Sequence, residues 1–177
     1  MERRRREQRF EDLPLEAREQ FAENTKERIY STITLLAVVV ALWHGAVHHS
    51  QGGALATIIG TVAALWLATL MSARMSYRAV HAKGMPLSEY RKIFFAASGL
   101  LAPAVVPSIL VILSAFGILE LKRALFASMV VLLLSLFLFS VMGSRRIYDS
   151  FGKVLLISLA ELSIGIGVVA IKLLAGE

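Results

Sequence analysis

Residues 154–174, VLLISLAELSIGIGVVAIKLL, form a run of 21 residues with only two charged side chains, Glu161 and Lys172. An α-helix of about 20 residues crosses the hydrocarbon core of a bilayer, which is about 30 Å thick. The run therefore predicts a membrane-spanning helix with one carboxylate near the middle of the membrane. Such a charge costs about 2.5–3.5 kcal/mol on insertion scales, so we expect Glu161 to be buried in protein, paired or functional.

Four more apolar runs of similar length precede this one, at residues 29–47, 53–73, 93–119 and 124–143. Of the 177 residues, 56% are hydrophobic and 18% are charged, whereas soluble domains have about 25% charged residues. We therefore predict an all-α fold, a polytopic transmembrane bundle of five helices over residues 29–177. The chain has no cysteine, which excludes disulfides and thiolate metal sites, and we expect no cofactor.

Basic residues gather on one side of the predicted bundle. If the N-terminus is cytoplasmic, 16 of the 19 Lys and Arg residues fall on the cytoplasmic side, and the other side keeps Lys122, Arg123 and Lys172. Because cytoplasmic loops are enriched in Lys and Arg, we predict a multi-pass protein of the plasma membrane with its N-terminus inside and its C-terminus outside. The basic residues flank apolar runs, which indicates lipid headgroups rather than nucleic acid as their partner.

Residues 1–28 precede the first run and divide into an arginine-dense tail and a short helix, predicted from about Leu13. Pro14 suits the first turn of such a helix. The eight acidic residues of this lead are unlike a signal peptide, so we expect it to be retained. One interpretation is a cytoplasmic interfacial helix whose tail binds anionic lipid headgroups. The other is a solvated leader that only enforces topology.

Small residues recur every four positions in the second run, at Ala56, Gly60, Ala64 and Ala68. This spacing forms a smooth groove on a helix, in which another backbone can approach closely. The groove packs either within one chain or between copies of the chain. Because a five-helix chain of this length is small, we expect a homo-oligomer.

The third run contains two prolines, Pro103 and Pro107. Each lacks a backbone N–H and displaces a carbonyl one turn earlier, so we predict a kinked helix. The freed carbonyls then need other donors, or they line a wet cavity as in the broken helices of transporters. An ordinary structural kink is the alternative.

Glu161 shares a helix face with Ser158 and Gly165, at steps of three and four residues. Lys172 lies about 16 Å further along the axis, too far to pair with Glu161. We predict an ion or proton site made of Glu161, Ser158 and Ser135. The alternative is a protonated Glu161 that hydrogen-bonds across a helix interface. The partners considered for it are Ser135, Ser140, Thr57, Thr61 and His44.

His44 and His48 lie four residues apart at the outer end of the first run, the spacing of two imidazole ligands on one helix face. A metal site is one interpretation of this pair, although no third ligand is evident nearby. The other places these residues, with Trp43, in the polar and aromatic belt at the membrane interface.

Three stretches resemble a group of small five-span actinobacterial integral membrane proteins: ERIYSTITLLAVV at residues 27–39, the region of Trp66, and VVAIK at residues 168–172. The resemblance covers residues 27–174 and implies the five-span fold but no activity. The span count and the inside N-terminus are also similar to the vacuolar iron transporter family, which moves divalent metal against protons. The chain differs from that family because its first span has no carboxylate, and residues 74–92 are short and basic where the family has a Glu- and Met-rich hairpin.

The sequence contains no nucleophile–base pair, phosphate loop or metalloprotease motif, so we do not expect an enzyme. Our leading hypothesis is an oligomeric channel or transporter for a small ion or proton. In it, Glu161 is the titratable site and the proline-kinked third span shapes the path. The alternative is a non-transporting membrane scaffold or an accessory subunit of a larger envelope complex.

Overall fold

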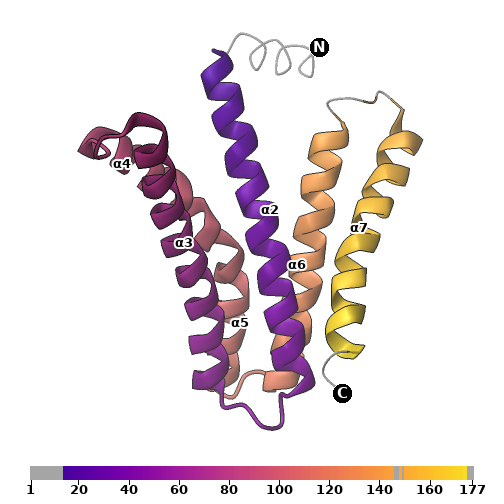
Figure 1. Ribbon diagram of the computed structural model, residues 1–177. Helices are drawn as coiled ribbons and strands as arrows, with labels where there is room; N and C mark the ends of the chain where they lie inside the picture. The colour runs from indigo at the N-terminus through magenta and orange to yellow at the C-terminus, as the bar shows by residue number, and fades with distance from the viewer. Residues whose placement is uncertain (1–13, 146–147, 149, 175–177) are drawn as a thin grey trace.

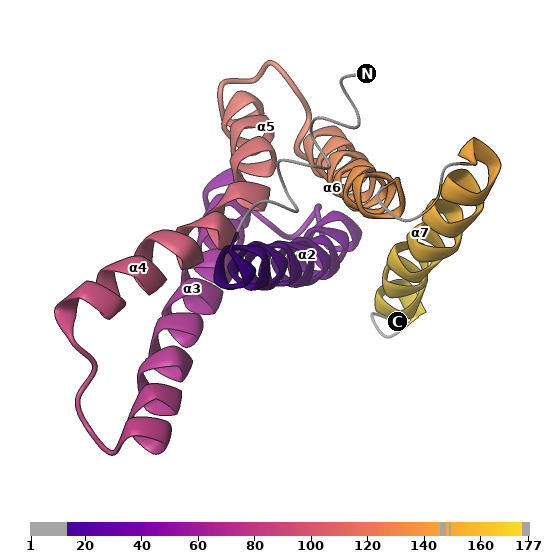
Figure 2. The ribbon, with the colours of Figure 1, turned by 90° about the horizontal axis from the view of Figure 1, so that it is seen from above.

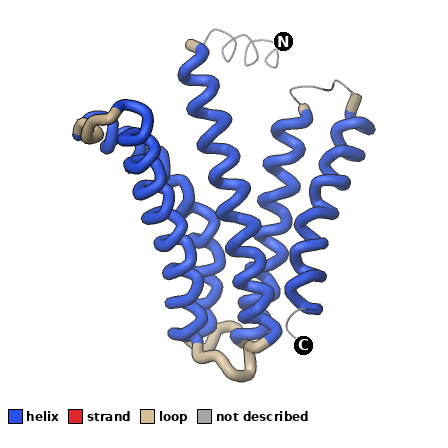
Figure 3. The backbone as a smooth tube through the Cα atoms, viewed as in Figure 1, coloured by secondary structure: helices blue, strands red, loops and turns tan. Residues whose placement is uncertain are grey.

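The described part of the chain consists of helices joined by short connections (Figure 3). The computed structural model describes residues 14–145, 148 and 150–174, and no strand occurs within these ranges. The predicted all-α class is therefore confirmed, while the arginine-dense tail lies outside the described residues. The elements are α2 (Leu15–His44), α3 (Gln51–His81), α4 (Leu87–Ala97), the 3-10 helix η1 (Ser98–Ala104), α5 (Val105–Ala115), α6 (Leu121–Ser144) and α7 (Phe151–Leu174).

Four stretches of the described chain are long and apolar enough to cross a membrane. They are α3, the continuous stretch Leu87–Ala115 that contains α4, η1 and α5, then α6 and α7, and they have 24 to 31 residues each. These helices are those of a multi-pass membrane protein. Four of the five predicted spans are thus confirmed by length and composition, and the first, at residues 29–47, stays a prediction.

The first predicted span and the short helix predicted before it form one continuous helix, α2. Pro14 directly precedes its first residue, and no proline or glycine follows until Gly45, so nothing in the sequence interrupts it. The prediction of a separate short helix is not confirmed. The N-terminal half of α2 carries charged residues such as Lys26, Glu27 and Arg28, and α2 is not among the four apolar candidates.

The third predicted span is broken at the proline expected to kink it. The 3-10 helix η1 separates α4 from α5 and contains Pro103, whereas Pro107 lies in the first turn of α5, where an N–H has no intrahelical acceptor. In a 3-10 helix the carbonyl of Leu100 would accept from residue 103, but proline has no N–H to donate. The hydroxyl of Ser31 on α2 donates to the Leu100 carbonyl instead, at 2.8 Å.

The helix α2 runs through the middle of the bundle, with α3 and α4 on one side and α7 on the other, and α5 and α6 lie against each other beside it (Figures 1 and 2). The α3–α4 and α6–α7 connections lie at the end where α2 begins, which we call the N-terminal end (Figure 1). The other two connections lie at the opposite end. This alternation places the described basic residues as the sequence predicts, because only Lys122, Arg123 and Lys172 belong to helix ends at the opposite end.

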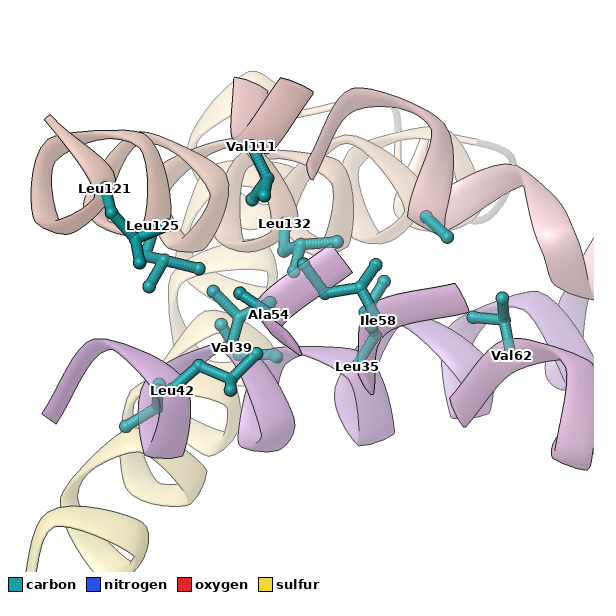
Figure 4. Packing of buried hydrophobic residues seen from close by; sticks show 13 residues of the cluster. Leu35, Val39, Leu42, Ala54, Ile58, Val62, Val111, Leu121, Leu125 and Leu132 are labelled. Atoms are coloured by element: carbon teal, nitrogen blue, oxygen red, sulfur yellow. The ribbon is translucent and has the colours of Figure 1, made fainter. Parts of the chain in front are cut away.

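The main hydrophobic core closes the half of the bundle away from the N-terminal end. It joins Leu35 and Val39 of α2, Ile58 of α3, Val111 of α5 and Leu132 of α6, all buried (Figure 4). A smaller cluster around Leu70 and Leu100 packs α3 against η1. Side chains therefore fill the bundle at its opposite half, and any open space in the region of α7 lies towards the N-terminal end.

Candidate functional site

A cavity of about 690 Å³ lies between α2, α6 and α7, and we call it the wedge. Its lining residues extend from Gly165 in the middle of α7 to Tyr148 in the α6–α7 connection, so it occupies the N-terminal half of the bundle. The apolar side chains that line it are Ile29, Ile33, Leu136, Phe139, Ile157 and Ile164. The polar side chains that line it are Thr25, Ser140, Ser144, Tyr148 and Glu161.

Gly165 marks the inner limit of the wedge. It is buried, and a β-carbon at this position would lie 3.3 Å from the tips of Leu133 and Leu136 on α6. The absence of a side chain therefore lets α7 approach α6 closely at this level, as expected for a packing glycine. Gly167, two residues on, has no such neighbour, so of these two glycines Gly165 is the one that the packing requires.

Glu161 lies on the face of α7 that is turned to the bundle. Its neighbours on that face, Ser158 and Gly165, are buried, yet Glu161 itself is exposed because its side chain lines the wedge. Among the described residues it has no hydrogen bond or ion pair. By contrast, Glu89 and Glu120 each pair with a basic residue three positions on, at 2.9 and 3.4 Å. Glu161 is therefore a carboxyl group that lines the wedge and has no partner within the described part of the chain.

Two serines near Glu161 have hydroxyl groups without a partner. Ser140 is 9% exposed, lines the wedge, and its Oγ is buried without a hydrogen bond in the described structure. Ser158 is fully buried with an equally unsatisfied Oγ, but it does not line the wedge. Unsatisfied buried hydroxyls are rare in native proteins, so each suggests an additional ligand or water at this level.

The predicted site of Glu161, Ser158 and Ser135 is brought together only in part. Glu161 and Ser158 are neighbours on α7, whereas the hydroxyl of Ser135 donates to the Val131 carbonyl of its own helix at 2.9 Å and lies outside the wedge lining. Ser140 takes the place predicted for Ser135. Since α6 and α7 are antiparallel neighbours that touch at Gly165, Ser140 lies about level with Glu161.

The other partners considered for Glu161 lie elsewhere. Thr57 and Thr61 donate to carbonyls of their own helix, at 2.9 and 2.7 Å, and α3 contributes no residue to the wedge lining. His44 ends α2 at the opposite end of the bundle. Sequence reasoning missed Thr25, Ser144 and Tyr148. The signal for Ser144 was its position one turn beyond Ser140 on the same face of α6.

His44 and His48 are exposed at the opposite end of the bundle, where α2 gives way to a turn. Within the described ranges, no group of three or more His, Asp or Glu residues is placed to hold a metal ion. The metal interpretation thus gains no third ligand. Nearby, the Lys122 ammonium lies 5.7 Å from the centre of the Trp43 ring, an arrangement that suits a membrane interface.

The small residues of α3 face away from the bundle. Ala56, Gly60, Ala64 and Ala68 are all exposed, and a β-carbon on Gly60 would have no neighbour within 4 Å. The groove is therefore not used for packing within the described chain. It stays open to lipid or to another molecule.

No protein-family model, curated protein or solved structure matches this chain. The two resemblances noted from the sequence therefore stay predictions, and the function has to be inferred from the geometry of the wedge.

Proposed function

We propose that the chain is a membrane transport protein for protons or small cations, with Glu161 as the carboxylate that binds the ion. The observation that carries this proposal is that Glu161, on an apolar helix, lines a cavity inside the bundle without a partner. An ionisable residue within a membrane span usually marks an ion or proton pathway when it faces a cavity. Ser140 supplies a hydroxyl at the same level that is free to accept or donate a hydrogen bond.

The shape of the wedge favours a transporter over an open channel within one chain. The wedge ends at Gly165, and the core around Leu35 and Leu132 fills the bundle beyond it. An ion bound at Glu161 reaches the other side only if α7 moves against α2 and α6, or if the path lies between copies of the chain. Pro103 and Pro107 do not line the wedge, so the broken third span is a structural feature of the opposite wall.

The topology proposed with this function has the N-terminal end of the bundle in the cytoplasm of a cell whose plasma membrane holds the protein. The concentration of basic residues at that end supports this orientation. In that case the wedge faces the cytoplasm, and the surrounding Lys and Arg residues contact anionic headgroups, each contributing about 1 kcal/mol near the surface.

Flux measurements on the protein in liposomes test this function. We expect proton or cation flux for the natural chain and a loss of at least about tenfold for Glu161→Gln, which keeps the size of the side chain but removes its charge. The matched control is Glu120→Gln, an exposed carboxylate that pairs with Arg123, and its flux should equal that of the natural chain. The absence of flux from the natural chain at every pH and potential would exclude transport.

A second candidate function is a non-transporting scaffold or accessory subunit, and the closed inner end of the wedge favours it. Here Glu161 receives a polar group from a partner helix that occupies the wedge. Under this alternative, Glu161→Leu abolishes complex formation in a co-purification experiment while no variant carries flux. Unchanged complex formation by Glu161→Leu excludes this candidate.

A further inference from the structure

We propose that the wedge binds an amphipathic organic cation, a molecule with one positive charge on a largely apolar body. This inference rests on the proposed role of Glu161 as the ion-binding carboxylate, and it adds an organic cation to the protons and small cations that this carboxylate binds. Three properties of the wedge support it: its size, the character of its walls and the charge within it.

The wedge is too large for a small inorganic ion alone. Its volume is about 690 Å³, whereas one water molecule occupies about 30 Å³ in the liquid. Pockets that enclose drug-sized organic molecules measure about 300–1,000 Å³. A single metal ion or proton at Glu161 would leave most of this volume to water in contact with isoleucine and leucine side chains, which is unfavourable.

The walls of the wedge fit an apolar body with one polar end. Isoleucines of α2 and α7 line the wedge together with Leu136 and Phe139 of α6. A mostly apolar cavity with a small number of placed polar groups is the usual form of an organic-ligand site. The rings of Phe139 and Tyr148 line the same cavity, and aromatic faces attract organic cations.

The charge inside the wedge selects a cation. Among the described lining residues, Glu161 is the acidic one, and no lysine, arginine or histidine belongs to the lining. An anion would be repelled, and a neutral molecule would leave the carboxylate unpaired in an apolar cavity. At the N-terminal end of these helices, the charged residues outside the lining whose side chains the structure describes are Lys26, Glu27, Arg28, Arg145 and Lys153.

Equilibrium dialysis of the purified full chain with tetraphenylphosphonium tests this inference. We expect saturable binding of one cation per wedge and at least about tenfold weaker binding by Glu161→Gln. Ile33→Trp, which fills the wedge but keeps the carboxylate, should weaken binding by the same factor. If Ile33→Trp does not fold, Ile157→Trp is measured in its place. Triphenylphosphine oxide, a neutral molecule of similar shape, should bind at least about tenfold more weakly than the cation.

The controls are Glu120→Gln, a carboxylate outside the wedge, and Ile59→Trp, at an exposed position of α3 that is 49% accessible. Both should bind as the natural chain does.

Equal binding by the natural chain, Glu161→Gln and the wedge-filling variant would overturn the inference, as would the absence of binding by the natural chain. If the natural chain carries Glu161-dependent proton flux but binds no phosphonium, the substrate class is wrong and the transport function stands. If it binds phosphonium through Glu161 but carries no flux, the inference about the ligand stands and the transport function is wrong.

Discussion

Ser31 shows how a single hydroxyl holds a broken helix in a membrane protein. Its Oγ donates to the Leu100 carbonyl at 2.8 Å, both residues are buried, and the natural donor is missing because residue 103 is proline. An unsatisfied carbonyl in this environment is costly because no water is present to replace the bond. The contact also ties η1 to α2, so it positions the wall of the bundle opposite the wedge.

Replacing Ser31 by alanine should destabilise the protein by about 1–2 kcal/mol, because the Leu100 carbonyl loses its donor in a buried setting. The measurement is reversible unfolding in mixed micelles, followed by helical circular dichroism. The matched control is Thr34→Ala, since the Thr34 hydroxyl donates at 2.9 Å to a carbonyl of its own helix in an exposed position. Equal stability of Ser31→Ala and Thr34→Ala would contradict this role of Ser31.

Residue-level reasoning from the sequence identified Glu161 but not its surroundings. Its place in an apolar run and its shared face with Ser158 and Gly165 follow from helix periodicity alone. The choice between Ser135 and Ser140 does not, because it depends on how far α6 slides along α7. That register is set by the close contact of Gly165 with Leu133 and Leu136, which only the packed structure contains.

The open face of α3 is the clearest feature at the scale of single elements. Its small residues are exposed on a helix apolar enough to span a membrane, and the described chain does not cover them. A smooth helix face of this kind allows a second helix to approach closely. Packing of a second copy of the chain on this face stays a prediction, as does the homo-oligomer itself.

Substituting Gly60 by leucine should weaken self-association through α3, because the larger side chain keeps the facing backbone at a distance. We expect a loss of about tenfold in association, measured by energy transfer between labelled copies in liposomes over a range of protein-to-lipid ratios. Leu67→Ile, an exposed position further along α3, serves as the control and should associate normally. If Gly60→Leu associates as the natural chain does, α3 is not the interface.

The ends and breaks of helices could be predicted from the sequence where a single residue, such as a proline, determines them. Proline at position 103 predicted the break in the third span, and the polar residues after position 143 predicted the end of α6 at Ser144. The end of α3 was predicted wrongly, because the helix continues eight residues beyond position 73, to His81. The fusion of the N-terminal helix with the first span was missed because the change from charged to apolar residues near Arg28 suggested a boundary. Helices end at breakers and caps rather than at changes of polarity, and residues 15–44 contain no breaker.

For the whole molecule, the arrangement of core and wedge carries the functional account. The core fills one half of the bundle, and the wedge opens the other half around Glu161. Sequence patterns predicted the four helices that are apolar enough to cross a membrane, but a cavity is the space left by side chains from three helices. It follows from packing, so composition and periodicity contain no signal for its volume.

The central claim is that Glu161 faces the wedge rather than lipid, and thiol labelling tests it most directly. The natural chain has no cysteine, so Glu161→Cys carries a single thiol, and so does its control Leu159→Cys on the outer face of α7, which is 50% exposed. In liposomes, a charged methanethiosulfonate reagent should modify the Glu161→Cys thiol at least about tenfold faster, because thiolates form in polar surroundings and not in hydrocarbon. Equally slow labelling of the two thiols would contradict the account.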